Sequence, residues 1–253
     1  MRTCENRIRK KIRTRACGTK QTIWVTRTAP DNTVTLEWLS QNGLDAVGVP
    51  VLETLRLQAP TPEIRPDVIV FTSVNGVRHH PADAALCNLP TYAVGDRTAD
   101  AARSAGFRDV ISAAGDVSDL EKLILRSVKS ESLLFHFSAL LPAGDLARNL
   151  TSSGLSVLRL AVYETRRVSH ERLCGDLPSL EELDGIVLHS PRAALSVVEY
   201  LDRSSIPFVG TVFCISQAAA QPLDHLQRAI VRVAERPDES SIRKLIASNA
   251  ASI

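Results

Sequence analysis

Cysteine is scarce in this sequence of 253 residues, and no two cysteines have the spacing of a motif. The five are scattered, odd in number and without a CxxC pair: Cys4, Cys17, Cys87, Cys174 and Cys214. This pattern argues against a disulfide framework and a structural zinc site, and it is typical of the reducing cytoplasm. Long apolar runs are also missing. None approaches the roughly 18 to 20 residues that cross a bilayer, and residues 1–20 lack the apolar region of a signal peptide.

Several motifs that mark a cofactor or a nucleophile are absent as well. The sequence has no GxGxxG or GxxxxGK[ST] phosphate loop, no GxSxG elbow and no HExxH zinc motif. Its six histidines show no metal-ligand spacing. We therefore expect neither a metal nor an organic cofactor. We interpret the adjacent His79 and His80 as surface residues, following the general preference of polar side chains for solvent.

Aromatic residues make up 4% of the chain and are not interleaved with basic ones, unlike in single-stranded nucleic-acid sites. Basic charge gathers in residues 1–20, whose net charge is about +7, while the whole chain carries +2. We interpret residues 1–21 as a disordered extension, because termini that are not tied down are commonly poorly ordered. An arm that contacts nucleic acid or an anionic membrane is the alternative. For the body of the chain we expect neither partner.

Hydrophobic residues reach 44% with 23% charged, the balance of a globular protein with a substantial core. Short apolar strands are expected at 22–26, 45–50, 68–72, 91–94, 109–112, 133–137, 156–163, 185–189 and 212–215. Amphipathic helical stretches are expected at 33–42, 98–105, 119–130, 144–153, 191–203, 218–225 and 239–250. This alternation predicts an α/β fold with parallel sheets flanked by helices.

The sequence also repeats itself after about 110 residues. DVIVFTSVNGV at 67–77 is echoed by DGIVLHSPRAA at 184–194. LEWLSQNGLDAVGVPVLET at 36–54 is echoed by LARNLTSSGLSVLRLAVYET at 146–165. Because the order of elements is the same in both copies, we predict two similar α/β domains.

Each copy contains an extended, alternating stretch that continues past the expected end of its strand. These stretches are VLETLRL at 51–57 and VYETRRV at 162–168, and we expect them to pair as a two-stranded linker. The chain would then leave the first domain early and return to it late. We assign residues 22–52 and 167–253 to a discontinuous domain 1, and residues 53–166, with the linker strands, to domain 2.

Ligands of open α/β sheets bind beyond the carboxyl ends of the strands, at loops that enter helices. Four loops of this kind carry polar residues in this sequence: Thr72, Ser73 and Asn75; Gly95 and Thr98; Ser190; Ser216. Helix capping explains each of them equally well when it is taken alone. Their recurrence in both halves favours a cleft for a large polyanionic ligand.

The series VTR, VPVLET, DVIVFTSVNGV, YAVGDRTADAARSAGF, VYETRR and DGIVLHSP, in this order, resembles uroporphyrinogen-III synthase over residues 22 to about 226. The resemblance implies two α/β domains joined by a two-stranded linker, with a cleft between them. It also implies a cyclising lyase of heme biosynthesis that uses no metal or organic cofactor. The substrate would be hydroxymethylbilane, a linear tetrapyrrole with eight carboxylates, which loses water and closes with its ring D inverted.

The resemblance further implies roles for individual residues. Tyr163 matches a tyrosine near the leaving hydroxyl, where its phenol could donate a proton or a hydrogen bond; packing against the cleft wall is the alternative. Thr98, Ser73 and Ser190 match positions that contact substrate carboxylates, and Arg27 and Asn75 match less closely.

Chemistry alone adds Arg97 and Arg192, because carboxylates favour arginine. The predicted substrate-binding set is Thr72, Ser73, Asn75, Gly95, Arg97, Thr98, Ser190, Arg192, Ser216 and Arg27. We expect a cytoplasmic monomer, with the upstream deaminase as a candidate for transient contact.

Two loops depart from the family pattern. Residues 137–139 read Phe-Ser-Ala where the family has an Arg–Gly pair, and residues 216–219 read Ser-Gln-Ala-Ala where it has glycine and threonines. These changes favour an alternative function, a diverged homologue that binds tetrapyrroles or other anions without turnover, or acts as a regulatory module. An unrelated two-domain binding protein for another anion is the third hypothesis.

Overall fold

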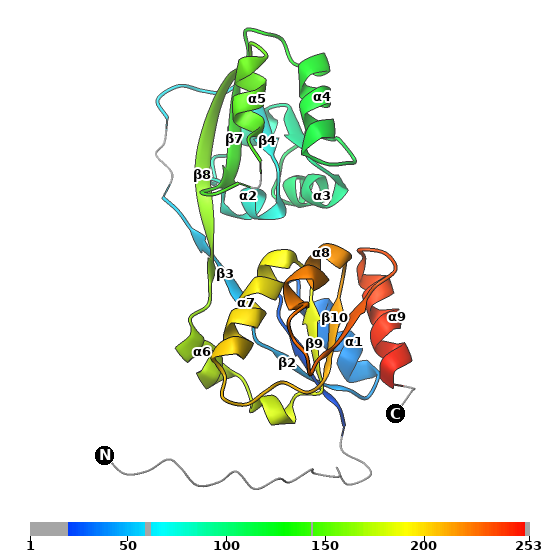
Figure 1. The fold of residues 1–253 in the computed structure, drawn as a ribbon. Coiled ribbons are helices and arrows are strands. Elements are labelled where there is room, and N and C mark those ends of the chain that lie inside the picture. The colour runs from blue at the N-terminus through cyan, green and yellow to red at the C-terminus, as the bar shows by residue number, and fades with distance from the viewer. Residues whose placement is uncertain (1–19, 59–61, 143, 251–253) are drawn as a thin grey trace, which may run out of the picture. The chain divides into compact units, whose positions relative to one another are not determined.

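The structure is a computed structural model that describes residues 20–58, 62–142 and 144–250 (Figure 1). It divides into two compact units. Among the described residues, unit 1 contains those up to Leu52 and from Val168 on, and unit 2 contains those between Glu53 and Arg167. Residues 1–19 of the predicted basic extension lie outside the described residues. No helix in the described part of the chain is long and apolar enough to cross a membrane.

Unit 1 has a five-stranded parallel sheet in the order β11-β10-β9-β1-β2. Its strands are β1 (Thr22–Val25), β2 (Asp45–Gly48), β9 (Gly185–Leu188), β10 (Thr211–Cys214) and β11 (Ile230–Val233). Its helices are α1 (Thr33–Gln41), α6 (His170–Asp176), α7 (Pro191–Arg203), α8 (Gln217–Ala220) and α9 (Glu239–Ala250), with short 3₁₀ turns η2 (Leu180–Glu182) and η3 (Gln221–Leu223). Every residue of β9 and β10 is buried, as expected of parallel strands covered on both faces.

Successive side chains along these strands pack alternately in two separate cores, one on each face of the sheet. Trp24 and Ile186 point to the core that contains residues of α6, α7 and α8. Ile23 and Val187 point to the opposite core, which contains residues of α1 and α9. The helices therefore cover both faces of the sheet.

Unit 2 has a six-stranded sheet in the order β3-β8-β7-β4-β5-β6. Its strands are β3 (Leu52–Arg56), β4 (Val68–Phe71), β5 (Thr91–Ala93), β6 (Val110–Ser112), β7 (Leu133–Ala139) and β8 (Ser156–Arg167). Its helices are α2 (Val74–His79), α3 (Asp96–Ser104), α4 (Val117–Ser127) and α5 (Leu146–Ser152), with a 3₁₀ turn η1 (Leu86–Asn88). Residues of α2 and α3 pack in the core on one face, and residues of α4 and α5 pack in the core on the other.

The two sheets have the same order when their strands are numbered along the sequence repeat. Unit 1 reads β2-β1-β9-β10-β11 and unit 2 reads β8-β7-β4-β5-β6, so both follow the flavodoxin-like order 2-1-3-4-5. In unit 1 the first two strands come from the first copy of the repeat and the other three from the second. Unit 2 has the reverse arrangement. Each unit thus combines halves of both copies, and the chain has to pass between the units twice.

Strands β3 and β8 pair where the chain makes these two passages. The backbone N–H of Val168 donates to Val51 (3.0 Å) and that of Leu57 donates to Val162 (2.9 Å). The two strands are antiparallel, because the residue numbers rise along one and fall along the other. The predicted two-stranded linker is confirmed, as is the predicted fold class of two α/β units with parallel sheets.

Candidate functional site

The strand order of each sheet marks one place where a ligand would bind. In a 2-1-3-4-5 sheet the connections diverge between strands 1 and 3, and ligands bind at the carboxyl end of that junction. The junction lies between β7 and β4 in unit 2 and between β1 and β9 in unit 1. Most of the predicted site residues follow β4, β5, β9 and β10, at these edges of the two sheets.

Tyr163 and Ser73 meet at the junction of unit 2. Their hydroxyl oxygens are 2.9 Å apart, within hydrogen-bond distance. Ser73 is the N-cap of α2 and its oxygen also accepts the backbone N–H of Gly76 (3.0 Å). Tyr163 comes from β8 and is 8% exposed. A phenol and a serine hydroxyl, one of them fixed by a helix cap, therefore form a connected pair of proton donors and acceptors.

A β-bulge turns Tyr163 toward α2. Ser138 of β7 pairs with Ala161 of β8, but the next residue, Ala139, pairs with Tyr163, so Val162 is an extra residue. Side chains alternate along a strand, and without this shift Tyr163 would share the face of Ala161. With the shift it joins the core formed by residues of α2 and α3.

Gly76 lets α2 lie directly on β7, beside Tyr163. A Cβ atom added at Gly76 would lie 2.7 Å from the carbonyl oxygen of Phe137, closer than real contacts of this kind. We expect Gly76→Ala to push α2 away from the sheet, to lower the free energy of unfolding by about 1 to 3 kcal/mol and to separate Ser73 from Tyr163. Urea unfolding and turnover measurements test both effects.

Gly175→Ala in α6 is the matched control, since nothing lies within 4 Å of the Cβ position of Gly175. It should leave turnover unchanged and stabilise the helix slightly. A Gly76→Ala protein with the stability and turnover of the unaltered chain would show that the contact with Phe137 relaxes without moving α2.

His136 forms a second polar pair on the other face of the same sheet. Its Nε2 lies 3.0 Å from Oγ1 of Thr72, and its Nδ1 is buried without a partner among the described residues. Burial first, and the charge of Arg159 second, lower the pKa of His136 to about 4. The imidazole is therefore neutral at neutral pH.

The end of β7 contains residues 137–139, which depart from the family pattern and were expected to form a loop, and Arg159 holds this end of the strand. Nη1 of Arg159 donates to the hydroxyl oxygen of Ser138 (3.2 Å) and to the carbonyl oxygen of Ala139 (3.0 Å). A guanidinium thus lies at the end of β7, although it comes from the neighbouring strand β8.

The remaining predicted residues of unit 2 do not gather around Tyr163 in the same way. Gly95 is the N-cap of α3, and Thr98, the third residue of that helix, is 5% exposed. Arg97 is exposed at the start of α3. Asn75 accepts a long hydrogen bond from Arg78 (3.5 Å).

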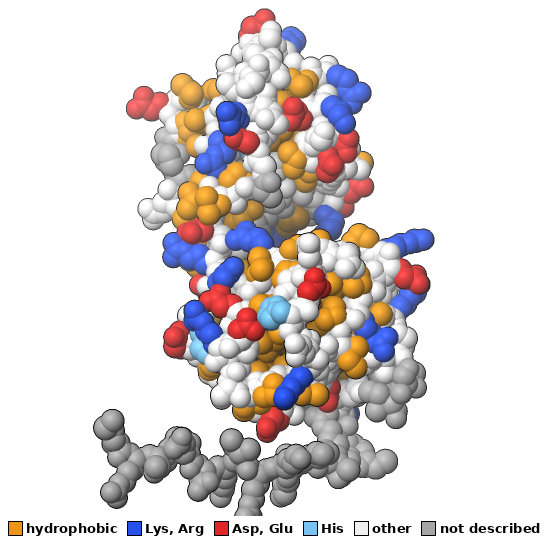
Figure 2. Space-filling view, viewed as in Figure 1, with side chains coloured by type: hydrophobic (Ala, Val, Ile, Leu, Met, Phe, Trp, Pro, Cys, Tyr) orange, Lys and Arg blue, Asp and Glu red, His pale blue; other side chains and the backbone are white. Residues whose placement is uncertain are grey.

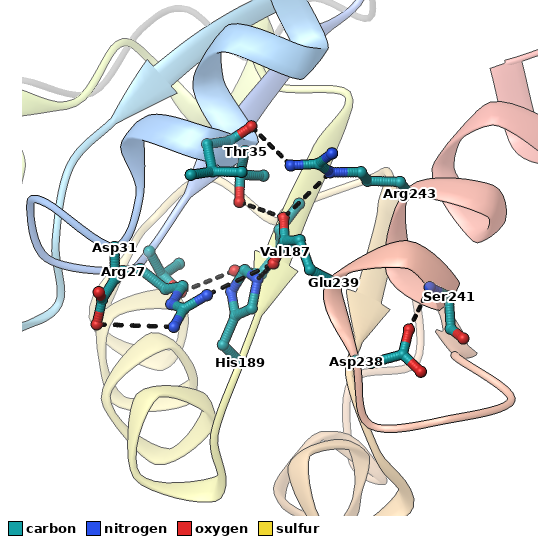
Figure 3. A network of polar contacts seen from close by, with 11 residues as sticks. Arg27, Asp31, Thr35, Val187, His189, Asp238, Glu239, Ser241 and Arg243 are labelled. Carbon is teal, nitrogen blue, oxygen red and sulfur yellow. Dashed lines mark hydrogen bonds and ion pairs between the residues drawn. The ribbon is translucent and has the colours of Figure 1, made fainter. Parts of the chain in front are cut away.

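Unit 1 has a carboxylate of its own at the junction of its sheet (Figure 3). Glu239, the first residue of α9, accepts hydrogen bonds from Oγ1 of Thr35 (2.5 Å) and from Nε2 of His189 (3.2 Å). Nη1 of Arg27 lies 3.5 Å from the same carboxylate, and Nε of Arg243 lies 3.6 Å from it. The carboxylate of Glu239 therefore joins the N-terminal end of α9 to the loops after β1 and β9.

The pKa values of Glu239 and His189 decide which of the two side chains is charged. Burial raises the pKa of Glu239, but the hydrogen bonds from His189 and Thr35 and the positive charge of Arg27 outweigh burial and bring the pKa to about 2. Burial lowers the pKa of His189 more strongly than its bond to Glu239 raises it. We conclude that Glu239 is ionised and that neutral His189 donates its Nε2–H.

The predicted residues of unit 1 have different surroundings. Arg27 also contacts Asp31 (3.8 Å), so this arginine lies between two carboxylates. Ser190 and Ser216 are N-caps whose oxygens accept the N–H of Ala193 and Ala219. Arg192 is exposed in the first turn of α7. On the face drawn in Figure 2, basic and acidic side chains are interspersed over both units.

The interpretation of His79 and His80 as surface residues was wrong. Both are partly buried. The ring of His80 packs against Phe71 and Phe107, and the ring of His79 lies against Tyr163. The alternating apolar residues around Tyr163 indicated that this strand packs in a core. They did not indicate that a histidine, His79, contacts the tyrosine ring. Glu239 was also missed, because it stands in no motif, and Gly76 was missed although it lies within DVIVFTSVNGV at 67–77.

A cavity of about 280 Å³ lies elsewhere in unit 2, under residues 62–66 and over Phe135, Phe137 and Leu160. None of the predicted site residues lines it. The polar contacts at the carboxyl edges, rather than this cavity, therefore define the candidate site.

Comparison with known proteins identifies the family. The sequence model of the family described as uroporphyrinogen-III synthase HemD matches residues 34–244. No curated protein sequence matches the chain. The structure resembles uroporphyrinogen-III synthetase of Helicobacter pylori with a TM-score of 0.63 and 16% identity, covering 91% of this chain and 100% of the other.

It also resembles a mutant uroporphyrinogen III synthase of Thermus thermophilus with a TM-score of 0.53 and 16% identity, covering 92% of this chain and 100% of the other. At this identity the likeness establishes the fold, while the family model covers most of the sequence. The chain therefore belongs to the uroporphyrinogen-III synthase family, the cyclising lyases of tetrapyrrole biosynthesis.

Proposed function

We propose that the chain converts hydroxymethylbilane into uroporphyrinogen III at a site built around Tyr163 and Ser73. The observation that carries this proposal is the 2.9 Å contact between the two hydroxyls at the junction of unit 2, in a chain of this family. Tyr163 would donate a proton to the terminal hydroxyl of the substrate, which departs as water and leaves an azafulvene cation.

The rest of the reaction would balance without a redox step. The substituted carbon of ring D attacks the cation and forms a spiro intermediate, which fragments and closes again with ring D inverted. Ring closure releases one proton, which restores the phenol. The hydrogen bond between Ser73 and Tyr163 would stabilise the phenolate in the interval.

Binding in this proposal depends on donors for the eight carboxylates of the substrate. Hydroxyl, amide or backbone donors would come from Ser190, Ser216, Thr72, Asn75, Gly95 and Thr98. Positive charge would come from Arg97 and Arg192. Arg27 is the weakest member of this set, because a substrate carboxylate would have to compete with Asp31 and Glu239 for it. Holding the flexible polyanion in one conformation is the main catalytic task.

We further propose that the protein acts as a cytoplasmic monomer and that its contact with the upstream deaminase is transient. The cysteines, which are scattered and odd in number, support the reducing compartment.

A coupled assay tests the proposed function. Hydroxymethylbilane is generated by a deaminase in the presence of the chain, and the porphyrin isomers are separated after oxidation. We expect isomer III to dominate, whereas the same mixture without the chain should give isomer I by spontaneous closure. If the folded chain gives isomer I alone, the non-catalytic binding or regulatory module replaces the enzyme as the best description.

A further inference from the structure

Helix α2 touches Tyr163 at both of its ends. Its N-cap, Ser73, bonds the hydroxyl of Tyr163. Its last residue, His79, lies against the ring of Tyr163, with ring centroids 5.9 Å apart and an angle of 31° between the planes. The tyrosine side chain therefore lies along the short helix α2. Its hydroxyl is at the N-terminal end of the helix, and its ring is beside the last residue.

We infer that His79 is a positioning residue of the reaction, which holds the ring of Tyr163 along α2 so that the hydroxyl stays on Ser73. This inference rests on the proposed function. It assigns to His79 a role in directing Tyr163 rather than in contacting the substrate.

The neighbouring histidine shows what a purely structural residue looks like at this position. His80 bonds the carbonyl oxygen of Val77 through Nδ1, and its ring packs against Phe71, Phe107 and Phe137. Arg56 of β3 donates to the carbonyl oxygen of His80 (3.4 Å) and ties the helix end to the sheet. The end of α2 is thus anchored by His80, which leaves the ring of His79 directed at Tyr163.

The charges around His79 favour a neutral ring. It is faced by Arg78 from its own helix, by Arg56 from β3 and by Tyr163 from β8. Burial, then Arg56, then Arg78 lower the pKa of His79. A neutral imidazole beside Tyr163 does not repel the cation that develops on the substrate, whereas an imidazolium there would raise the barrier.

A set of variants tests this role through isomer ratio and pH profile. His79→Ala should lower kcat by about 10- to 100-fold with little change in KM, because the phenol is no longer aligned. The share of isomer I should rise, since the misaligned intermediate closes without inversion. His79→Phe keeps a ring against Tyr163, so we expect it to retain most of the turnover near pH 8.

The pH profile separates positioning by a neutral imidazole from simple packing. In the unaltered chain, turnover should fall at acidic pH as His79 gains a proton. Because the pKa of His79 is lowered, this fall should occur below pH 6.5, the ordinary pKa of histidine. His79→Phe should remove this fall. Arg78→Ala should move it to higher pH, because the loss of a nearby positive charge raises the pKa of His79. The control His225→Phe, at an exposed histidine of unit 1 that pairs with Asp202, should change neither turnover nor profile.

Two results would overturn the inference: an unchanged kcat and isomer ratio in folded His79→Ala, or an unchanged acid limb in His79→Phe. If His79→Ala does not fold, the pH profiles of turnover of His79→Phe and Arg78→Ala decide whether His79 positions Tyr163. Failure of the proposed function itself is a separate result, since the unaltered chain would then give isomer I alone.

Discussion

Replacing Tyr163 with phenylalanine is expected to lower kcat by about 10²- to 10⁴-fold, the usual contribution of a positioned general acid. Phenylalanine keeps the ring that packs against His79 and in the core of unit 2. It removes the hydroxyl that contacts Ser73, and with it the proton for the departing water. Spontaneous closure should then compete, so that the coupled assay shifts from isomer III toward isomer I.

The two other tyrosines of the chain provide matched controls. Tyr92 and Tyr200 are buried to a similar degree, 5% and 7% exposed, and neither lies at the junction of unit 2. Tyr92→Phe and Tyr200→Phe should therefore change stability slightly and leave the isomer ratio as it is. A Tyr163→Phe protein that still makes isomer III at the original rate would refute the proton-donor role and leave Tyr163 a packing residue.

The second large effect is expected on stability, at Glu239. Glu239→Gln keeps the shape of the side chain but removes the charge that Arg27 and Arg243 face. We expect the free energy of unfolding at pH 7 to fall by about 2 to 3 kcal/mol, since a difference of one pKa unit corresponds to about 1.4 kcal/mol. This range allows for the partial exposure of the side chain, which is 26%. Urea unfolding of the two proteins measures the difference.

The pH dependence of this difference follows from the direction of the shift. The carboxyl has a pKa of about 2 in the folded chain and an ordinary value of 4.5. Its contribution is therefore complete above pH 4.5 and is lost as the pH falls toward 2. The stability curves of the unaltered chain and Glu239→Gln should converge over this interval. Glu235→Gln, at an exposed residue four positions earlier, should follow the unaltered chain throughout. Parallel curves would mean that the charge of Glu239 contributes nothing to folding.

Some elements were not predictable from local pattern. Strand β11 is an edge strand whose residues are mostly exposed, so it shows little alternation between apolar and polar positions. Helix α2 is six residues long and contains Gly76, so its intrinsic helix propensity is low. It forms because Ser73 caps it and because Gly76 permits close contact with β7, both of which are features of the folded unit.

The sequence singled out some residues of the candidate site but not their arrangement. Ser73 and Tyr163 were both singled out, yet their contact joins positions 90 residues apart. Arg27 was also singled out, but nothing local indicated that Glu239, 212 residues later, would lie against it. His79 was misinterpreted because the residue that covers its ring comes from a distant strand.

The sequence by itself determined the fold class, the duplication and the paired linker, because periodic burial and the repeat are recorded in the order of residues. Only the tertiary structure decided two other features. A β-bulge turns Tyr163 toward α2, and Glu239 lies at the junction of unit 1. Each depends on register and on contacts between residues far apart in the chain. A shift of one residue reverses the face of a strand, and no local pattern records it.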